Sequence, residues 1–430
     1  MALIEFTNKG LYCSPGDFYI DPWAPVDRAV ITHAHSDHAR WGSASYLCHT
    51  DCKPLLYLRL GDVNVQSMEW EDSTYLNGVK ISLHPAGHMI GSSQVRVEYK
   101  GEVWVVSGDY KTEDDGLSGK FEPVRCNTFI TESTFGLPIY HWKPQHEIFQ
   151  NIQDWITANR EAGKISVLLA YSLGKAQRLL QCIPAVCNDI YVHGAIWNAH
   201  LTLQQAGWAL PDVKRVTPDL PKEAYTGKVI IAPPSADGTP WIKRFRPHAV
   251  GICSGWMQVR GNVRRRNADA GFALSDHADW KGLLESIKAT GAEKVFVTHG
   301  FQSVLSRYLN EYGIEAAEVK TEFGKEDDEI IPSNDEATEG NQTTSAELAP
   351  ARTAYAGETM KDTDETNNKT EITDASEDID MNSENIDHNS GDETKLRNEG
   401  KINSLNNGGD VDPLKNDSDV DSDKYKTKDQ

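Results

Sequence analysis

Residues 29–38 read Ala-Val-Ile-Thr-His-Ala-His-Ser-Asp-His, a short apolar run that leads directly into three imidazoles and one carboxylate. The first four residues have the length and β-branching of a strand, so the polar residues are expected at its carboxyl end. Alternation along the chain would let His33 and His35 bind one metal ion, while Asp37 and His38, after a turn, face a second. The alternative is a polar loop with solvated histidines.

Two metal ions need more ligands than this loop supplies, and suitable residues follow other predicted strands. They are His88 in Ala-Gly-His-Met-Ile-Gly-Ser, Asp109 in Val-Val-Ser-Gly-Asp and His299 in Val-Thr-His-Gly. Each comes after an apolar run and lies close to a glycine. The two carboxylate oxygens of Asp109 could bridge two cations. Any one of these residues alone would be assigned a structural role, but together with the loop they predict a dinuclear metal site.

The pattern of apolar runs divides the chain. Before Pro138 we expect short strands, at 18–21, 29–32, 79–83, 94–99, 102–107 and 128–131. Helix-like stretches at 146–162 and 175–181 then alternate with strand-like runs at 165–170, 189–193, 228–232 and 249–253. This alternation predicts an α/β insert with parallel strands. The first pattern then resumes, with helices expected at 280–290 and 302–311 and strands at 294–298 and 316–319.

Acidic residues are concentrated at the end of the chain. The whole chain has a formal net charge of −21, of which residues 333–430, with 25 acidic and 10 basic side chains, carry 10 − 25 = −15. This tail contains no Trp, Phe or Cys, so it cannot bury enough apolar surface to offset the entropy of ordering. The sequence therefore predicts a disordered acidic tail.

Composition excludes several classes of protein. No apolar run approaches the roughly 18 residues of a membrane helix, and the start, MALIEFTNKG, does not resemble a secretory signal. The 7 cysteines are odd in number and scattered, which argues against a disulfide framework. Cys48 and Cys52 lack a second cysteine pair that would complete a zinc knuckle. We expect an intracellular, cytoplasmic protein, with association with the nucleoid as a further option.

The motifs HAHSDH, AGHMIGS, SGDY and THG, in this order, resemble those of the metallo-β-lactamase superfamily. The resemblance implies an α/β fold, the αββα sandwich, with two Zn²⁺ ions at the ends of its strands and Mn²⁺ as an alternative. It also implies the ligands. The first ion would be bound by His33, His35, His88 and Asp109, and the second by Asp37, His38, Asp109 and His299, with a bridging water between them. Asp21 matches the family's early aspartate, which orients a ligand histidine.

Three further motifs resemble those of the β-CASP nucleases. Residues 131–136 (TESTFG) resemble ESTYG, residues 275–279 (SDHAD) resemble SxHxD, and residues 171–178 (YSLGKAQR) resemble FALGRAQ. Glyoxalases and lactamases have neither these motifs nor the insert. The resemblance implies a metallo-β-lactamase domain formed by residues 1–136 and 257–325, a β-CASP-like insert at 137–256 and the acidic tail at 333–430. Within the group, residues 10–43 resemble the bacterial ligase-associated DNA damage response exonucleases, also labelled mRNA 3′-end processing factor homologues.

The chemistry expected of such a site is phosphodiester hydrolysis. Two cations activate a water and neutralise the charge that develops on the phosphorane. Protonation of the leaving oxygen still needs an acid, and we assign it to His277, with Glu132 holding the imidazole in orientation. Asp37 is counted with the catalytic residues as well as with the ligands. The alternative for His277 is an ordinary polar residue at a helix start, because Ser275, Asp276 and Asp279 could form an N-cap region.

Nucleic acid also needs a binding track. Basic residues cluster late in the predicted insert and after it, with tryptophans between them, so that arginines could pair with phosphates and a base could stack on an indole. The predicted substrate-binding residues are Lys175, Arg178, Lys243, Arg244, Arg246, Arg260, Arg264, Arg265 and Trp256, with Arg266 and Trp241 beside them. The alternative is a solvated basic surface that faces acidic neighbours or the tail.

The sequence thus predicts a metal-dependent nuclease. The resemblance of the whole domain favours a DNA exonuclease in DNA repair, with a DNA ligase and a helicase as implied partners. His299 in the last motif is typical of RNA-acting β-CASP members, so an RNA-processing endonuclease or exonuclease of the 3′-end type stays an alternative. A non-catalytic scaffold is a third option, although every ligand position is filled.

Overall fold

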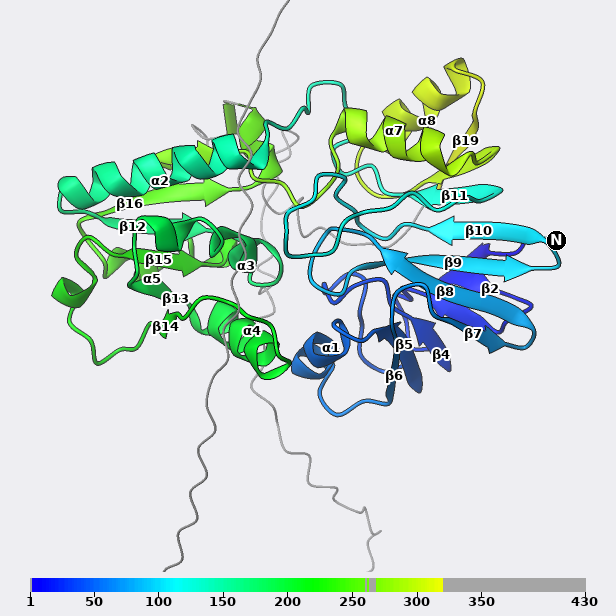
Figure 1. Cartoon of the computed structure of the whole chain (residues 1–430), viewed down its shortest axis with the longest axis horizontal. Coiled ribbons are helices and arrows are strands. Elements are labelled where there is room, and N and C mark those ends of the chain that lie inside the picture. Colours follow the sequence, from blue (N-terminus) through cyan, green and yellow to red (C-terminus); the bar gives the residue numbers. More distant parts are fainter. Residues whose placement is uncertain (1, 260, 263–267, 320–430) are drawn as a thin grey trace, which may run out of the picture. The chain divides into compact units, whose positions relative to one another are not determined.

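The structure of the chain is a computed structural model, which describes residues 2–259, 261–262 and 268–319 (Figure 1). The tail at 333–430, for which the sequence predicts disorder, lies outside the described residues. None of the helices in the described ranges has the length and hydrophobicity that crossing a bilayer requires.

The first sheet carries the predicted ligand loop. Its order is β1-β2-β3-β4-β5-β6, with antiparallel pairing up to β3 and parallel pairing from β3 onward. The strands are β1 (Glu5–Thr7), β2 (Gly10–Cys13), β3 (Phe18–Ile20), β4 (Arg28–Val30), β5 (Ser45–His49) and β6 (Val65–Met68). Ile31 N–H still donates to Leu47 O, at 2.8 Å, so the HxHxDH loop begins where sheet pairing ends.

The second sheet is mixed and has the order β19-β18-β11-β10-β9-β8-β7. Its strands are β7 (Ser73–Leu76), β8 (Val79–Pro85), β9 (Ser93–Tyr99), β10 (Glu102–Val106), β11 (Thr128–Thr131), β18 (Lys294–Val297) and β19 (Glu315–Glu318). The parallel neighbours β10, β11 and β18 all end at one edge. Side chains that follow these strands therefore gather at that edge, although β18 begins more than 150 residues after β11 ends.

The two sheets pack face to face and are covered by helices. One apolar cluster joins Leu11, Ile20 and Val30 of the first sheet to Val95, Trp104 and Ile130 of the second. Three helices cover the outer faces: α1 (Lys53–Leu60) on the first sheet, and α7 (Trp280–Thr290) with α8 (Gln302–Glu311) on the second. Figure 1 shows α1 beside β5 and β6, and α7 and α8 on the side of the second sheet. The expected αββα sandwich is confirmed.

The third sheet is entirely parallel, as the alternation of helices and strands predicted. Its order is β14-β13-β15-β12-β16-β17. Its elements are α2 (Gln145–Glu161), β12 (Ile165–Leu169), α3 (Lys175–Leu179), β13 (Ile190–Val192), α4 (Gly194–Gln205), β14 (Lys214–Arg215), β15 (Val229–Ala232), α5 (Pro240–Lys243), β16 (His248–Cys253) and β17 (Ala270–Phe272). Short 3₁₀ turns are interspersed at Ile183–Ala185, Lys222–Tyr225, Pro234–Ala236 and Gly255–Gln258.

Side chains alternate between the two faces of this sheet. Leu168 and Ile231 belong to one apolar cluster, while Val167 and Ile230, their neighbours in sequence, belong to the other. Both faces are therefore buried, as parallel sheets require. The proposed insert boundary at residue 256 stays a prediction, but β17 pairs with β16 and extends this sheet to Phe272.

Candidate metal centre

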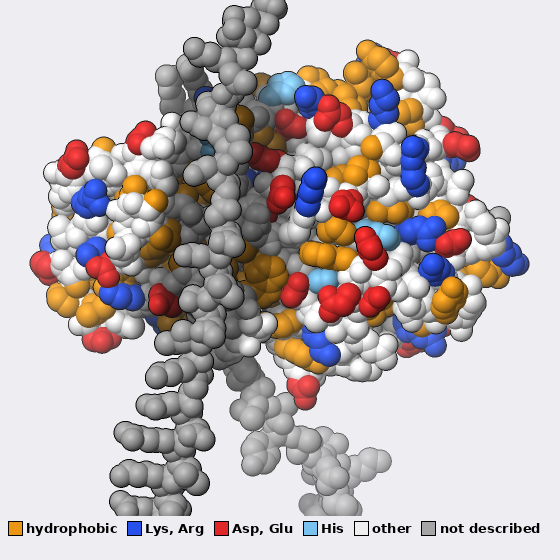
Figure 2. All heavy atoms as spheres, in the orientation of Figure 1, with side chains coloured by type: hydrophobic (Ala, Val, Ile, Leu, Met, Phe, Trp, Pro, Cys, Tyr) orange, Lys and Arg blue, Asp and Glu red, His pale blue; other side chains and the backbone are white. Residues whose placement is uncertain are grey.

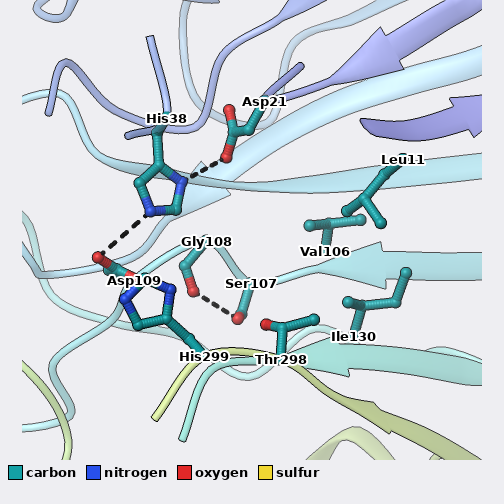
Figure 3. Close-up of a pocket in the computed structure, with 10 residues that line it drawn as sticks. All are labelled: Leu11, Asp21, His38, Val106, Ser107, Gly108, Asp109, Ile130, Thr298 and His299. Atoms are coloured by element: carbon teal, nitrogen blue, oxygen red, sulfur yellow. Dashed lines mark hydrogen bonds and ion pairs between the residues drawn. The ribbon is translucent and has the colours of Figure 1, made fainter. Parts of the chain in front are cut away.

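Asp21 fixes the start of the ligand loop. It follows β3 in a left-handed conformation, with φ 43°, and its carboxylate faces the loop. The Thr32 amide donates to Oδ1 at 2.8 Å and the Thr32 hydroxyl donates to Oδ2 at 2.6 Å. Oδ2 also accepts a hydrogen bond from Nδ1 of His38 at 2.8 Å (Figure 3). Because Nδ1 donates to this carboxylate, Nε2 is the nitrogen of His38 that would bind a metal ion once it has lost its proton, which supports the orienting role predicted for Asp21.

The four residues predicted to bind the first ion lie together. His33, His35, His88 and Asp109 each offer one ligand atom within 4.8 Å of the others; His35 is half-buried and the other three are buried. His88 Nε2 is 3.1 Å from His35 Nδ1, and Asp109 Oδ2 is 3.6 Å from His33 Nε2 and 3.9 Å from His88 Nε2. Three strand ends therefore supply one compact donor set of the kind that transition metals prefer.

A second group adjoins the first. Asp37, His38 and His299 also offer ligand atoms within 4.8 Å of one another. His38 Nε2 is 3.5 Å from both Asp37 Oδ2 and Asp109 Oδ2. Figure 3 shows His38 between Asp21 and Asp109, with His299 beside Asp109. Asp109 thus lies between the two groups, where a carboxylate can bind two ions.

The protonation states of two buried histidines suit metal binding, while that of His38 opposes it. Burial, together with the neighbouring imidazoles, holds the pKa of His33 well below its usual range and lowers the pKa of His88 to about 3. Both rings are therefore neutral at pH 7 and offer lone pairs. Burial also opposes protonation of His38, but the carboxylates of Asp37 and Asp109 outweigh it and raise the pKa of His38 well above its usual range. Metal binding at His38 must therefore displace a proton.

The donor set fits two divalent cations. His33 Nε2 and Asp37 Oδ1 are buried, and neither has a hydrogen-bond partner among the described residues. A buried polar atom without a hydrogen-bond partner lowers the stability of the folded state. A metal ion bound within each ligand group would give these two atoms a partner. Imidazole and carboxylate donors suit Zn²⁺, and Mn²⁺ accepts the same ligand types.

Two of the three β-CASP-like motifs, TESTFG and SDHAD, meet at the same place. His277 Nδ1 lies 3.0 and 2.9 Å from the two carboxylate oxygens of Glu132. The amide of Tyr110 and the hydroxyl of Thr134 also donate to Glu132, at 2.7 and 2.5 Å. Asp109, Glu132 and His277 have ligand-type atoms within 4.8 Å of one another. The predicted acid and its partner therefore adjoin the metal groups, although 145 positions separate them in sequence.

The turn that carries His299 is held by a residue that the sequence analysis did not single out. His299 has φ 57° and is followed by Gly300 with φ 68°. The Ser133 hydroxyl donates to Thr298 O at 3.1 Å and also to His299 O. A Cβ on Gly300 would lie 2.3 Å from Ser133 O, so only glycine fits there. Ser133 belongs to the TESTFG motif, which was the available signal.

The mouth of the site includes residues from the insert. One pocket is lined by His35, Asp37, His88, Asp109, Tyr171, Lys175, Asp276, His277 and His299. Lys175 Nζ lies 3.3 Å from Asp276 Oδ2 and 4.8 Å from the centre of the Tyr171 ring. Burial raises the pKa of Asp276, but Lys175 and Arg178 outweigh this and lower it to about 2. Tyr171 and Asp276 were quoted in the sequence motifs but not chosen as site residues.

The other predicted substrate-binding residues lie elsewhere. Arg178 is buried, with Nη1 3.0 Å from Asp276 Oδ1. Trp256 is 3% exposed and packs against Phe135 and Tyr140, so base stacking on it would require the side chain to move.

Several of the remaining basic residues are outside this pocket. Lys243 and Arg246 are exposed, and Arg244 is half-buried over the Phe245 ring at 4.7 Å. Arg260, Arg264, Arg265 and Arg266 lie outside the described residues. On the visible part of the face in Figure 2, Lys and Arg side chains are interspersed with Asp and Glu. The basic track stays a prediction, and of the described residues assigned to it only Lys175 lines the pocket.

Comparisons with known proteins agree with this geometry. The model of the metallo-beta-lactamase superfamily matches residues 21–134. A protein named probable DNA ligase from Opitutus terrae is 30% identical over 319 residues, which are 73% of this chain and 30% of that protein. Endoribonuclease YSH1 from Yarrowia lipolytica is 27% identical over 41% of this chain and 21% of its own length. An RNase J-like protein from Methanocaldococcus jannaschii is 20% identical over 44% of this chain and 53% of its own length.

The matched part of the chain spans less than a third of the first two of these relatives. The residues matched by the superfamily model include Asp21, the HxHxDH loop, His88, Asp109 and Glu132. The same residues surround the buried histidine and aspartate groups at the strand ends of an αββα sandwich. The chain therefore belongs to the metallo-β-lactamase superfamily, and its relatives include proteins named as endoribonucleases.

Proposed function

We propose that this chain is a metal-dependent phosphodiesterase that acts on nucleic acid, as a DNA exonuclease in DNA repair. The observation that carries the proposal is the contact between His277 and Glu132 beside the two metal-ligand groups. A hydrolase of lactams or thioesters does not need this pair. The third, parallel sheet between Glu132 and His277 is the insert that the nuclease resemblance implies.

The charges in the pocket favour a phosphodiester only when cations are bound. Asp37, Asp109 and Asp276 line it, against the single ammonium of Lys175. A phosphate anion would be repelled by these carboxylates unless bound cations offset them. When bound, two divalent cations supply Lewis acidity at the scissile phosphate and lower the pKa of a nearby water. Lys175 then pairs with a phosphate oxygen from the insert side.

The residues of the chain supply the proton for the leaving oxygen. Because Glu132 accepts from His277 Nδ1, the other ring nitrogen, Nε2, is directed away from Glu132. Since His277 lines the pocket, Nε2–H is placed to donate to the departing 3′ or 5′ oxygen. Glu132 stabilises the protonated ring and keeps its orientation. The scaffold alternative gives no reason for a buried His–Glu pair at this position.

RNA processing is the second candidate function. It is favoured by the relatives named endoribonuclease and by His299, whereas the probable DNA ligase matches a larger share of the chain. That printed name also supports a DNA ligase as a partner in the same repair process, with a helicase as a further partner implied by the family resemblance. DNA is preferred here because the match with the probable DNA ligase spans 73% of this chain, against 41% for the endoribonuclease from Yarrowia lipolytica.

A single panel of substrates tests the proposal. The full chain, loaded with Zn²⁺ or Mn²⁺, is incubated with end-labelled single-stranded DNA, RNA of the same sequence, nitrocefin and a glutathione thioester. We expect DNA to be shortened from one end, and faster than RNA. Faster cleavage of RNA would replace the first candidate by the second. Turnover of nitrocefin or the thioester with both nucleic acids intact would overturn the nuclease assignment.

A further inference from the structure

The insert contacts the metal-ligand groups unequally. His38, in the second group, is oriented by Asp21, which comes from the first sheet. In the first group, His35 Nε2 lies 3.3 Å from Leu173 O, a carbonyl of the insert. A carbonyl can only accept, so Nε2 donates and Nδ1 of His35 faces His88, 3.1 Å away. One ligand of the first group therefore takes its orientation from the insert.

His88 depends on the insert by a second route. Its Nδ1 lies 2.9 Å from the backbone oxygen of Asp276, so Nδ1 donates and Nε2 faces the other ligands. The Asp276 carboxylate is buried and is paired on both oxygens, by Arg178 Nη1 at 3.0 Å and by Lys175 Nζ at 3.3 Å. Both cations belong to α3 or its first turn, and both are buried.

Arg178 has the contacts of a fixed anchor. Besides Asp276 it donates to Ser275 O through Nη1 and to the Gln145 side chain through Nε at 2.5 Å. The guanidinium thus bonds to the backbone of Ser275 and to the side chain of Asp276. A buried carboxylate such as that of Asp276 is stable only while it keeps cationic partners. The next residue, His277, has its amide bonded to Ser275 Oγ at 3.1 Å.

The approach of the insert to this site is close. Gly174, between Leu173 and Lys175, has φ 84°, and a Cβ there would lie 3.1 Å from Met89 Cβ. Residue 174 therefore has to be small and left-handed for Leu173 O to reach His35.

We infer that Arg178 is a positioning residue for the first metal-ligand group: it acts through Asp276 on His88, while Leu173 of the same segment orients His35. The inference rests on the ligand assignment of the proposed function. The insert thereby controls the affinity of one metal ion and not of the other.

A two-step metal titration tests the inference. The full chain, stripped of metal, is titrated with Zn²⁺ against a chromophoric chelator, as wild type, Arg178→Gln and Arg178→Lys. We expect Arg178→Gln to weaken one of the two binding steps by about 10- to 100-fold, the scale for residues that support a metal ligand, and to leave the other unchanged. Arg178→Lys should lose less, because it keeps the charge.

Two reference variants sharpen the result. Arg160→Gln removes an insert arginine that donates to Val186 O at 2.7 Å, away from the pocket, and should bind both ions as the wild type does. Asp21→Asn should weaken both steps, since Asp21 bonds to His38 directly and to His33 through the Thr32 hydroxyl. Two unchanged binding steps in Arg178→Gln, or equal weakening of both, would overturn the inference. If Arg178→Gln does not fold, Arg178→Lys decides by the same criterion.

The titration needs no substrate, so it separates the inference from the proposed function. A wild-type chain that binds two ions but cleaves no nucleic acid would remove the proposed function, and selective weakening in Arg178→Gln would still support the inference. If the wild-type chain cleaves nucleic acid but Arg178→Gln binds both ions normally, the proposed function is supported and the inference about Arg178 is overturned.

Discussion

Asp109 has the position of a shared ligand. Its Oδ2 lies 3.6, 3.5 and 3.9 Å from imidazole nitrogens of His33, His38 and His88. Burial opposes ionisation of this carboxyl, but His38 and the other imidazoles outweigh it and hold its pKa well below the usual range. A carboxylate that stays ionised between two groups of histidines is suited to bind both ions.

The first prediction compares Asp109→Ala with His88→Ala. We expect His88→Ala to lose about one metal equivalent and Asp109→Ala to lose more than one, since Asp109 adjoins both groups. Elemental analysis of the purified proteins measures the content, with the exposed His146→Ala as control. A wild-type protein that carries no metal and gains no activity on addition of Zn²⁺ or Mn²⁺ would contradict the site.

The second prediction concerns His277. His277→Ala should keep metal and nucleic-acid binding but lose the chemical step by about 10² to 10⁴-fold, the scale of general acid catalysis. Single-turnover rates at saturating enzyme measure this step, again against His146→Ala. If His277→Ala turns over as fast as the wild type while chemistry limits the rate, the histidine is not the acid.

At the scale of secondary structure, helix α7 shows which residue of the SDHAD motif caps the helix. A position at a helix start was the alternative role considered for His277. The N-cap of α7 is Asp279, whose Oδ1 accepts the Gly282 amide at 2.7 Å, while Oδ2 accepts the Trp142 amide at 3.0 Å. His277 precedes the cap and bonds to Glu132 instead. Within one motif the helix-capping residue and the proposed acid are therefore separate residues.

The third prediction follows from this cap. Asp279→Ala should lower the free energy of unfolding by about 1–2 kcal/mol, because it removes an N-cap and leaves the Trp142 amide without its acceptor. Urea denaturation of the metal-free protein measures the change. Lys281→Ala, in the same helix but exposed, should change the stability by no more than about 0.5 kcal/mol. Equal effects of the two substitutions would mean that the cap contributes nothing measurable.

Charge is distributed unevenly over the whole molecule. Residues 1–332 carry −21 + 15 = −6, whereas residues 333–430, outside the described residues, carry −15. The proposed substrate is a polyanion, so an acidic tail tethered to the catalytic domain should compete with it. A tether of suitable reach keeps that competitor at about millimolar local concentration.

The fourth prediction is a truncation after Pro332. Removing the tail should leave metal content intact and tighten binding of single-stranded nucleic acid at low ionic strength. The gain should shrink as salt rises, because the Debye length falls to about 10 Å at 0.1 M. Fluorescence anisotropy over a salt series measures the affinity. Equal affinity at every salt concentration would show that the tail does not compete, and loss of the fold would place the domain boundary elsewhere.

Much of the fold and site could be predicted from the sequence, because the signals are local. The strands at 128–131 and the helices at 280–290 and 302–311 appear with the bounds expected from their apolar patterns. The ligands follow strands whose parallel ends share one edge, so their meeting follows from their positions in the chain. The elements missed were short or weakly patterned, such as α1, which begins after two buried cysteines, and β17, which has three residues.

Only the tertiary structure decided what surrounds those ligands. Arg178 and Asp276 are 98 positions apart, and no local pattern shows that a cation will be buried against a particular carboxylate. The sequence suggested Arg178 for phosphate and Trp256 for a base, because both residue types serve these roles on surfaces. Their burial depends on how the turn at 275–277 packs against α3 and on how Phe135 and Tyr140 cover the indole. Local sequence determined which residues follow which strands, and long-range packing determined which of them face the pocket.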